Sequence, residues 1–134
     1  MQRMIVSLIL ISGLLLSAVP AGAHHAFATE FDGNKPVTMK GIVTKIDWAN
    51  PHVWFYLNLK TEGDVIENWG FEMGGPNSLR SSGWTRETMK IGDEVIVDGS
   101  LAKNGSHNVN AKSVTMASTG KRLGAASSQG NTVD

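Results

Sequence analysis

Residues 52–60 read HVWFYLNLK, and apolar side chains occupy every second position along this stretch. Successive side chains of a strand point to opposite faces, so the stretch predicts a β-strand with two unlike faces. One face is aliphatic and aromatic and carries Val53, Phe55, Leu57 and Leu59. The other face mixes aromatic and polar groups and carries His52, Trp54, Tyr56 and Asn58. We expect the first face to be buried and the second to form an outer surface.

Four further stretches have the β-branched and aromatic composition of strands. They are residues 37–48, 65–73, 94–101 and 109–116. The stretch 65–73 alternates again, which places Asn68 and Glu72 opposite its large apolar side chains. Pro76 suits the start of a helix and Gly83 its end, so we expect a short helix after the third strand.

Three strands, a short helix and two more strands follow one another in the order of an OB-type fold. We therefore predict an all-β chain with small helical content. Its architecture would be a five-stranded antiparallel OB-like barrel with a short helix between strands 3 and 4. Gly41 lies within the first strand, where a long strand can bend. An open α+β sandwich is the alternative architecture.

The first 23 residues have the composition of a secretory signal peptide. Arg3 supplies a positive charge, residues 4–19 form an apolar stretch without a charge, and residues 21–23 are small. The apolar stretch is shorter than the roughly 20 residues that span a membrane, so we expect cleavage instead of an anchor. The preferred cut follows Ala23, and a second cleavage site is available after Ala28.

The rest of the chain divides into three parts. We expect an N-terminal lead-in at residues 24–36, the OB-like barrel domain at residues 37–116 and a disordered tail at residues 117–134, which is rich in Gly and Ser. This division predicts an exported protein, periplasmic or secreted, which is a monomer and has no membrane contact after cleavage.

Charge and cysteine content exclude several classes of protein. The 134 residues contain 12 Lys and Arg against 12 Asp and Glu, without the excess of basic residues that marks a nucleic-acid-binding surface. The sequence has no cysteine, which excludes disulfides, thiolate catalysis and Cys-ligated metal sites. We therefore expect no nucleic-acid partner, and a fold that depends on packing alone.

Five short motifs occur together along the chain. They are His24-His25-Ala26-Phe27, Asn50-Pro51-His52, Trp69-x-Phe71-Glu72-Met73, Gly83-Trp84-Thr85-Arg86 and Gly92-Asp93-x-Val95-x-Val97. Through them, residues 24–116 resemble a family of small exported bacterial proteins of unknown function. The resemblance implies an exported OB-like barrel. It brings no activity, substrate or catalytic residue, so the function has to be inferred from the residues.

The outer face of the second and third strands is the first candidate site, because OB barrels bind their ligands across this surface. Trp and Tyr offer flat stacking area with polar tips, and the remaining side chains supply donors and acceptors. The candidate ligand-binding residues are His52, Trp54, Tyr56, Asn58, Asn68 and Glu72. Two alternatives are structural: Phe27 and Phe31 of the lead-in cover this face, and His52 caps backbone groups of the turn after Pro51.

The processed N-terminus is the second candidate site. After cleavage at Ala23, the free α-amine and the imidazole of His24 or His25 could bind a metal ion, with a third nitrogen from His52 or His107. A planar set of nitrogen ligands favours Cu(II). Copper is therefore the one cofactor we consider, and a periplasmic copper-binding protein is the alternative function.

Motifs of common enzyme classes are missing from the sequence. It has no G-x-S-x-G nucleophile elbow, no phosphate-binding loop with its lysine and no H-E-x-x-H motif. Glu72 has no carboxylate partner on its predicted face, so paired acid–base catalysis is not indicated. We expect a binding domain and not an enzyme, with a small molecule or another exported protein as its partner.

Overall fold

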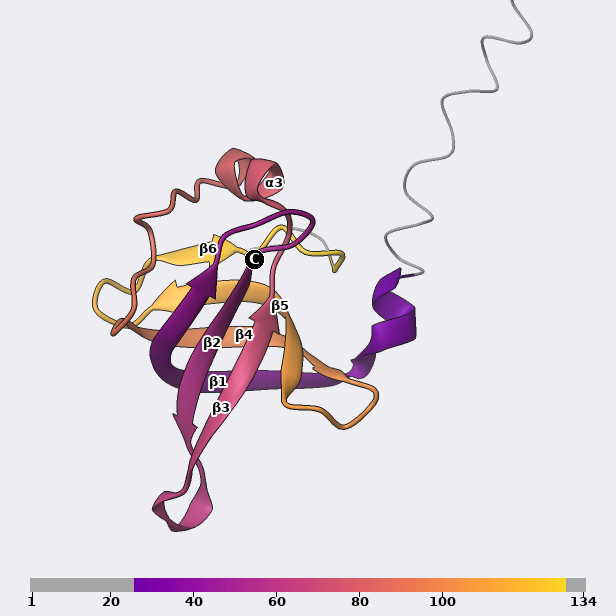
Figure 1. Ribbon diagram of the computed structural model, residues 1–134, viewed down its shortest axis with the longest axis vertical. Coiled ribbons are helices and arrows are strands. Elements are labelled where there is room, and N and C mark those ends of the chain that lie inside the picture. Colours follow the sequence, from indigo (N-terminus) through magenta and orange to yellow (C-terminus); the bar gives the residue numbers. More distant parts are fainter. Residues whose placement is uncertain (1–25, 130–134) are drawn as a thin grey trace, which may run out of the picture.

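The computed structural model describes residues 26–129, and most of this part of the chain is β-sheet (Figure 1). Its strands are β1 (Phe31–Asp47), β2 (Trp54–Lys60), β3 (Ile66–Glu72), β4 (Glu94–Ala102), β5 (Asn108–Met116) and β6 (Arg122–Gly124). Its helical segments are a turn at residues 26–30, the 3₁₀ turn η1 (Glu62–Asp64) and helix α3 (Pro76–Ser81). The predicted signal peptide, together with His24 and His25, lies outside the described residues.

The sheet closes into a ring. Its strands follow the order β3-β2-β1-β4-β5-β6, and a parallel pairing of β3 with β5, the strand next to β6, closes the ring. The other neighbours are antiparallel. Strands β1 to β5 therefore make up the ring in the OB-type order, with α3 between β3 and β4 as predicted. The described chain has six strands instead of the predicted five, because β6 pairs with the second half of β5.

The strand β1 takes part in two pairings and curves around the ring (Figure 1). Its first half pairs with β4 and its second half with β2, and Ile42 lies opposite both Asn58 and Glu94. A Cβ atom on Gly41 would come within 2.6 Å of the Asn58 carbonyl oxygen. Glycine is therefore required where β1 passes from one partner to the other.

The apolar face of β2 forms the centre of the core, as the alternation in residues 52–60 predicts. Val53, Phe55 and Leu57 have no exposed surface. Phe55 stacks on Phe71 of β3 with ring centroids 5.1 Å apart. This packing directs the side chains at the intervening positions of β2 and β3 outward, where the candidate site lies.

The chain after β5 is ordered as far as Gln129, so the predicted disordered tail is wrong for residues 117–129. Ala125 is fully buried, and its carbonyl oxygen accepts a hydrogen bond from the Gly74 N–H at 2.9 Å. The indole N–H of Trp84 donates to the Gly124 carbonyl oxygen at 2.8 Å. The small residues of this segment therefore pack closely against the rest of the fold.

The N-terminal lead-in also differs from its predicted boundaries. Strand β1 begins at Phe31 instead of residue 37, because Phe31 pairs with Ala102 at the end of β4. The helical turn before it lies beside the loop between β4 and β5 (Figure 1), and the Lys103 N–H donates to the Glu30 carbonyl oxygen at 2.9 Å. No helix in residues 26–129 is long and apolar enough to cross a membrane.

Candidate functional site

The outer face of β2 and β3 carries the predicted site residues in rows that run across the two strands. Trp54 lies opposite Glu72, and Asn58 lies opposite Asn68. Tyr56 lies opposite Gly70, where a Cβ atom would be 3.2 Å from the Tyr56 ring and 3.4 Å from the Trp54 ring. Gly70 therefore allows both rings to lie close to the backbone of β3.

Two cavities open on this face and share Glu30 and Phe31 as walls. The first has a volume of about 320 Å³, and its walls include Phe27, Glu30, Phe31, His52 and Glu72. The second has a volume of about 400 Å³, and its walls include Glu30, Phe31, Trp54, Lys103, Asn104 and Asn108. We call the two together the β2–β3 groove. The groove lies where OB folds bind ligands, between the face of strands 2 and 3 and the loops that follow strands 1 and 4.

The N-terminal segment forms the wall that the two cavities share. Phe31 is only 4% exposed, and its ring stacks on that of Phe27 with centroids 6.1 Å apart. The expected alternative, in which the lead-in covers this face, is thus observed in part. The cover is incomplete, because the two cavities remain on either side of it.

The ring of His52 is held by a backbone group, the carbonyl of Met73. Its Nδ1 atom lies 3.1 Å from the Met73 carbonyl oxygen, an acceptor, so Nδ1 carries the proton. Oε1 of Glu72 lies 4.0 Å from the same nitrogen. The described residues provide no partner for Nε2, and that nitrogen remains for a ligand. His52 does satisfy a backbone group, as its structural alternative expects, but this group belongs to Met73, directly after β3, and not to the turn after Pro51.

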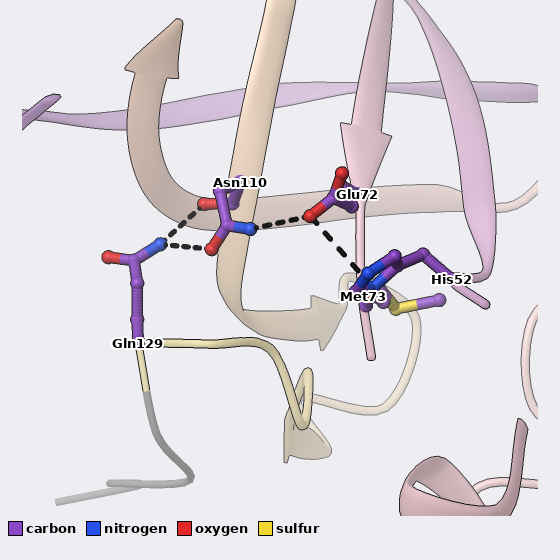
Figure 2. Close-up of polar contacts among 5 residues, drawn as sticks. All are labelled: His52, Glu72, Met73, Asn110 and Gln129. Carbon is purple, nitrogen blue, oxygen red and sulfur yellow. Dashed lines mark hydrogen bonds and ion pairs between the residues drawn. The ribbon is translucent and has the colours of Figure 1, made fainter. Parts of the chain in front are cut away.

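The carboxylate of Glu72 is held in a buried network (Figure 2). The residue is 9% exposed, and its Oε1 accepts a hydrogen bond from Asn110 at 3.1 Å. Gln129 donates to the Oδ1 atom of Asn110 at 2.7 Å, which fixes the orientation of that amide. Burial raises the pKa of Glu72; the nearby His52 opposes this rise, and the charge of Glu30 adds to it. A carboxyl with a raised pKa at the wall of a cavity is characteristic of functional sites.

A family model matches residues 12–111 of the chain, and it describes a family of unknown function designated DUF6152. The chain belongs to this family. The match includes most of the β2–β3 groove, from Ala26 to Asn108, and also Asn110, the partner of Glu72. Gln129 lies beyond the part of the chain that the DUF6152 model covers. No curated protein matches the chain.

Half of the predicted site residues lie outside the groove. Nδ2 of Asn68 donates to Oδ1 of Asn58 at 2.9 Å and to Oγ1 of Thr44 at 3.1 Å. The ring of Tyr56 lies beneath Lys45, whose Nζ is 5.2 Å from the ring centroid. The structure therefore brings together His52, Trp54 and Glu72, whereas Tyr56, Asn58 and Asn68 line neither cavity of the groove.

Several residues of the groove and its supporting network are not apparent from the sequence. Glu30 belongs to the lead-in, and only the folded chain shows that its carboxylate shares a cavity with Glu72. Asn108 and Asn110 alternate with Val109 in β5, and this pattern could have placed both amides on the outer face. The same pattern does not show that β5 pairs with β3, which is what brings the two amides beside Glu72.

Two of the candidate metal ligands, His24 and His25, lie outside the described residues, whereas His52 and His107 lie within them. In residues 26–129 no three side chains of His, Cys, Asp or Glu are grouped closely enough to hold a metal ion. His107 stacks on Trp69 with centroids 4.3 Å apart and lines neither cavity. His52 lines a cavity together with Ala26, the residue that follows His25 in the sequence. Of the two histidines considered for a third nitrogen, the arrangement favours His52.

A larger cavity of about 590 Å³ lies over β1 and β4, but its polar groups are largely paired with one another. Asp98 accepts hydrogen bonds from Thr38 at 2.6 Å and from Ser113 at 3.2 Å. Arg122 forms an ion pair with the same carboxylate at 3.3 Å. This cavity therefore offers a ligand fewer free groups than the β2–β3 groove does.

Proposed function

We propose that this protein binds a small molecule in the β2–β3 groove and is not an enzyme. The observation that carries the proposal is the meeting of two cavities at Glu30 and Phe31, in the position where OB folds take their ligands. Cavities of about 300–1,000 Å³ are typical of small-molecule sites. The two volumes, about 320 and 400 Å³, lie within this range.

The chemistry of the groove supports binding more than catalysis. Trp54 gives a flat ring that is only partly covered, Glu72 gives a carboxylate and His52 gives a free ring nitrogen. These groups can stack on a ligand and hydrogen-bond to it. Ser128 lines the first cavity together with His52, but its hydroxyl forms no hydrogen bond with that ring among the described residues, so the two are not paired as the nucleophile and base of covalent catalysis are.

We propose that the protein is located in the periplasm or outside the cell. The charged start, apolar stretch and small residues of the first 23 positions support export. Loss of this segment would leave a mature chain that begins at His24, only a few residues before the wall of the groove. A partner protein that presents a side chain to the groove is the alternative to a free small molecule.

The test is a screen of a small-fragment library by ligand-observed NMR, with three forms of the mature protein. Wild-type protein should bind a set of fragments that Trp54→Ala loses, because Trp54 lines the second cavity. Tyr56→Ala is the matched control, since Tyr56 lies on the same face but outside both cavities. Equal losses in the two variants, with both folded, would contradict a site confined to the groove.

Copper binding is the second candidate function, and one observation favours it. His52 keeps Nε2 free and shares a cavity with Ala26, which follows His24 and His25 in the sequence. A histidine ligand that donates its other N–H to a backbone carbonyl is the usual arrangement at metal sites. The processed amine, one N-terminal imidazole and Nε2 of His52 would supply the nitrogen ligands that Cu(II) prefers.

The copper candidate is tested by native mass spectrometry after one equivalent of Cu(II). We expect the chain that starts at His24 to retain the metal, and one extra residue before His24 to weaken retention by displacing the amine. His52→Ala should also weaken it, whereas His107→Ala should not. Retention that survives both the extension and His52→Ala would contradict this copper site.

A further inference from the structure

We propose that the β2–β3 groove selects ligands that carry an ammonium group, which would lie in the cavity between Glu30 and Glu72. This inference rests on the proposed function and names the class of ligand. The cavity, its charges and its aromatic walls each support it.

The charge of this cavity is unbalanced. Two carboxylates, those of Glu30 and Glu72, line it, and no Lys or Arg is among its described walls. Lys103 borders the neighbouring cavity, but its ammonium donates to the Ala28 carbonyl oxygen. His52 adds a positive charge only when it is protonated. With both carboxylates ionised, the cavity therefore carries a negative charge that a cationic ligand would complement.

The carboxylate of Glu72 has acceptor capacity left over. Its Oε1 accepts one hydrogen bond, from Asn110, and Oε2 has no hydrogen-bond partner among the described residues. A carboxylate has about four lone-pair sites, and a buried charge that lacks partners is costly. An ammonium group brings both the opposite charge and up to three N–H donors.

The remaining walls favour an organic cation. Phe27 and Phe31 form a stacked pair beside the two carboxylates. Aromatic faces attract ammonium groups and also cover the adjoining carbon chain. A metal ion has no carbon chain for these rings to cover. The combination of phenyl walls and acidic groups is therefore best matched by an alkyl or benzyl ammonium.

Three probes of nearly equal shape test the inference: benzylammonium, benzyl alcohol and benzoate. Binding to the mature protein is followed at pH 7 through backbone amide shifts, with a chelator present to remove copper. We expect benzylammonium to bind at least about tenfold more tightly than benzyl alcohol, and benzoate to bind more weakly than either. Glu72→Gln should bring the first two affinities to within about twofold of each other.

Glu62→Gln is the matched control, because Glu62 is an exposed carboxylate in η1 and lies outside the groove. It should leave the preference for benzylammonium unchanged. If Glu72→Gln does not fold, Glu30→Gln provides the same test from the other wall of the cavity. A smaller loss of preference is expected there, since Glu30 is exposed.

The possible results separate the two proposals. Equal affinity for benzylammonium and benzyl alcohol, with shifts at the groove, would overturn the ammonium inference and leave the binding function standing. Shifts that map away from Trp54 and Glu72 would overturn both. Absence of binding by benzylammonium up to millimolar concentration would also overturn the ammonium inference, whatever the fragment library shows.

Discussion

The Nδ1 atom of His52 lies 3.1 Å from the carbonyl oxygen of Met73, and this hydrogen bond joins the loop after β1 to the end of β3. It fixes which ring nitrogen carries the proton and which one stays free. The loop and the strand both border the first cavity, through His52 and Glu72. One contact thus orients the imidazole and holds together two walls of the proposed site.

Replacement of His52 by Ala should lower the free energy of unfolding by about 1 kcal/mol. The Met73 carbonyl would lose its side-chain donor, and a typical hydrogen bond contributes about 0.5–1.5 kcal/mol to stability. Urea denaturation of the mature protein measures the change. A loss below about 0.3 kcal/mol would mean that the bond does not restrain the loop.

Glu72→Gln should make the protein more stable at pH 7 and not at acidic pH. The folded-state pKa of Glu72 is raised above its ordinary value of 4.5, mainly by burial. The folded state therefore binds the proton more tightly than the unfolded state does, and this contribution to stability is lost as the pH rises through the raised pKa. Glutamine cannot ionise, so the variant escapes that loss while keeping an acceptor for Asn110.

The measurement is the free energy of unfolding of wild type and Glu72→Gln from pH 4 to pH 8. The advantage of the variant should be absent below pH 4.5 and should grow through the raised pKa. A variant that is more stable and yet loses ligand binding would show that Glu72 is kept for function. If the difference in free energy of unfolding between Glu72→Gln and wild type does not change with pH, the raised pKa of Glu72 is not its cause.

Adjacent residues of β2 should respond in opposite ways to truncation. Phe55 has no exposed surface, so Phe55→Ala should cost about 3–5 kcal/mol. Trp54 is only partly buried on the outer face, so Trp54→Ala should cost less than about 2 kcal/mol and leave the domain folded. Chemical denaturation compares the two. Equal costs would make Trp54 a core residue and would remove it from the proposed site.

Removal of residues 125–134 should destabilise the protein by about 2 kcal/mol or more. The truncated chain would lose buried Ala125, its hydrogen bond with Gly74 and the contact of Gln129 with Asn110. Thermal unfolding of the full and shortened mature chains measures the effect. Unchanged stability would indicate that this segment contributes no packing, as the composition of the tail suggested.

The sequence predicts the core well where one face of a strand is buried. Along β2 the alternation determines which side chains point inward, since a shift by one residue would expose Phe55 and bury Asn58. The last segment could not be predicted in this way. Its fold depends on the close approach of small residues, such as Ala125 to Gly74. Its composition alone predicts a flexible tail.

Part of the candidate site is likewise predictable from the alternation of side chains along a strand. Period-two geometry put Trp54 and Glu72 on one outer face, and that depends on local sequence alone. The contribution of Glu30 depends on where the N-terminal segment lies in the folded chain, beside the loop between β4 and β5, which no local pattern encodes. The same contact between distant segments encloses the cavity and leaves Tyr56 outside it.

The central claim is that the β2–β3 groove holds the ligand. Its most direct test is a map of backbone amide shifts in the wild-type mature protein, recorded with the strongest binders from the fragment library. The account predicts that the largest shifts fall on Trp54, Glu72 and Asn108, around the two cavities. Shifts centred on Asp98 and Arg122 in the cavity over β1 and β4 would contradict it.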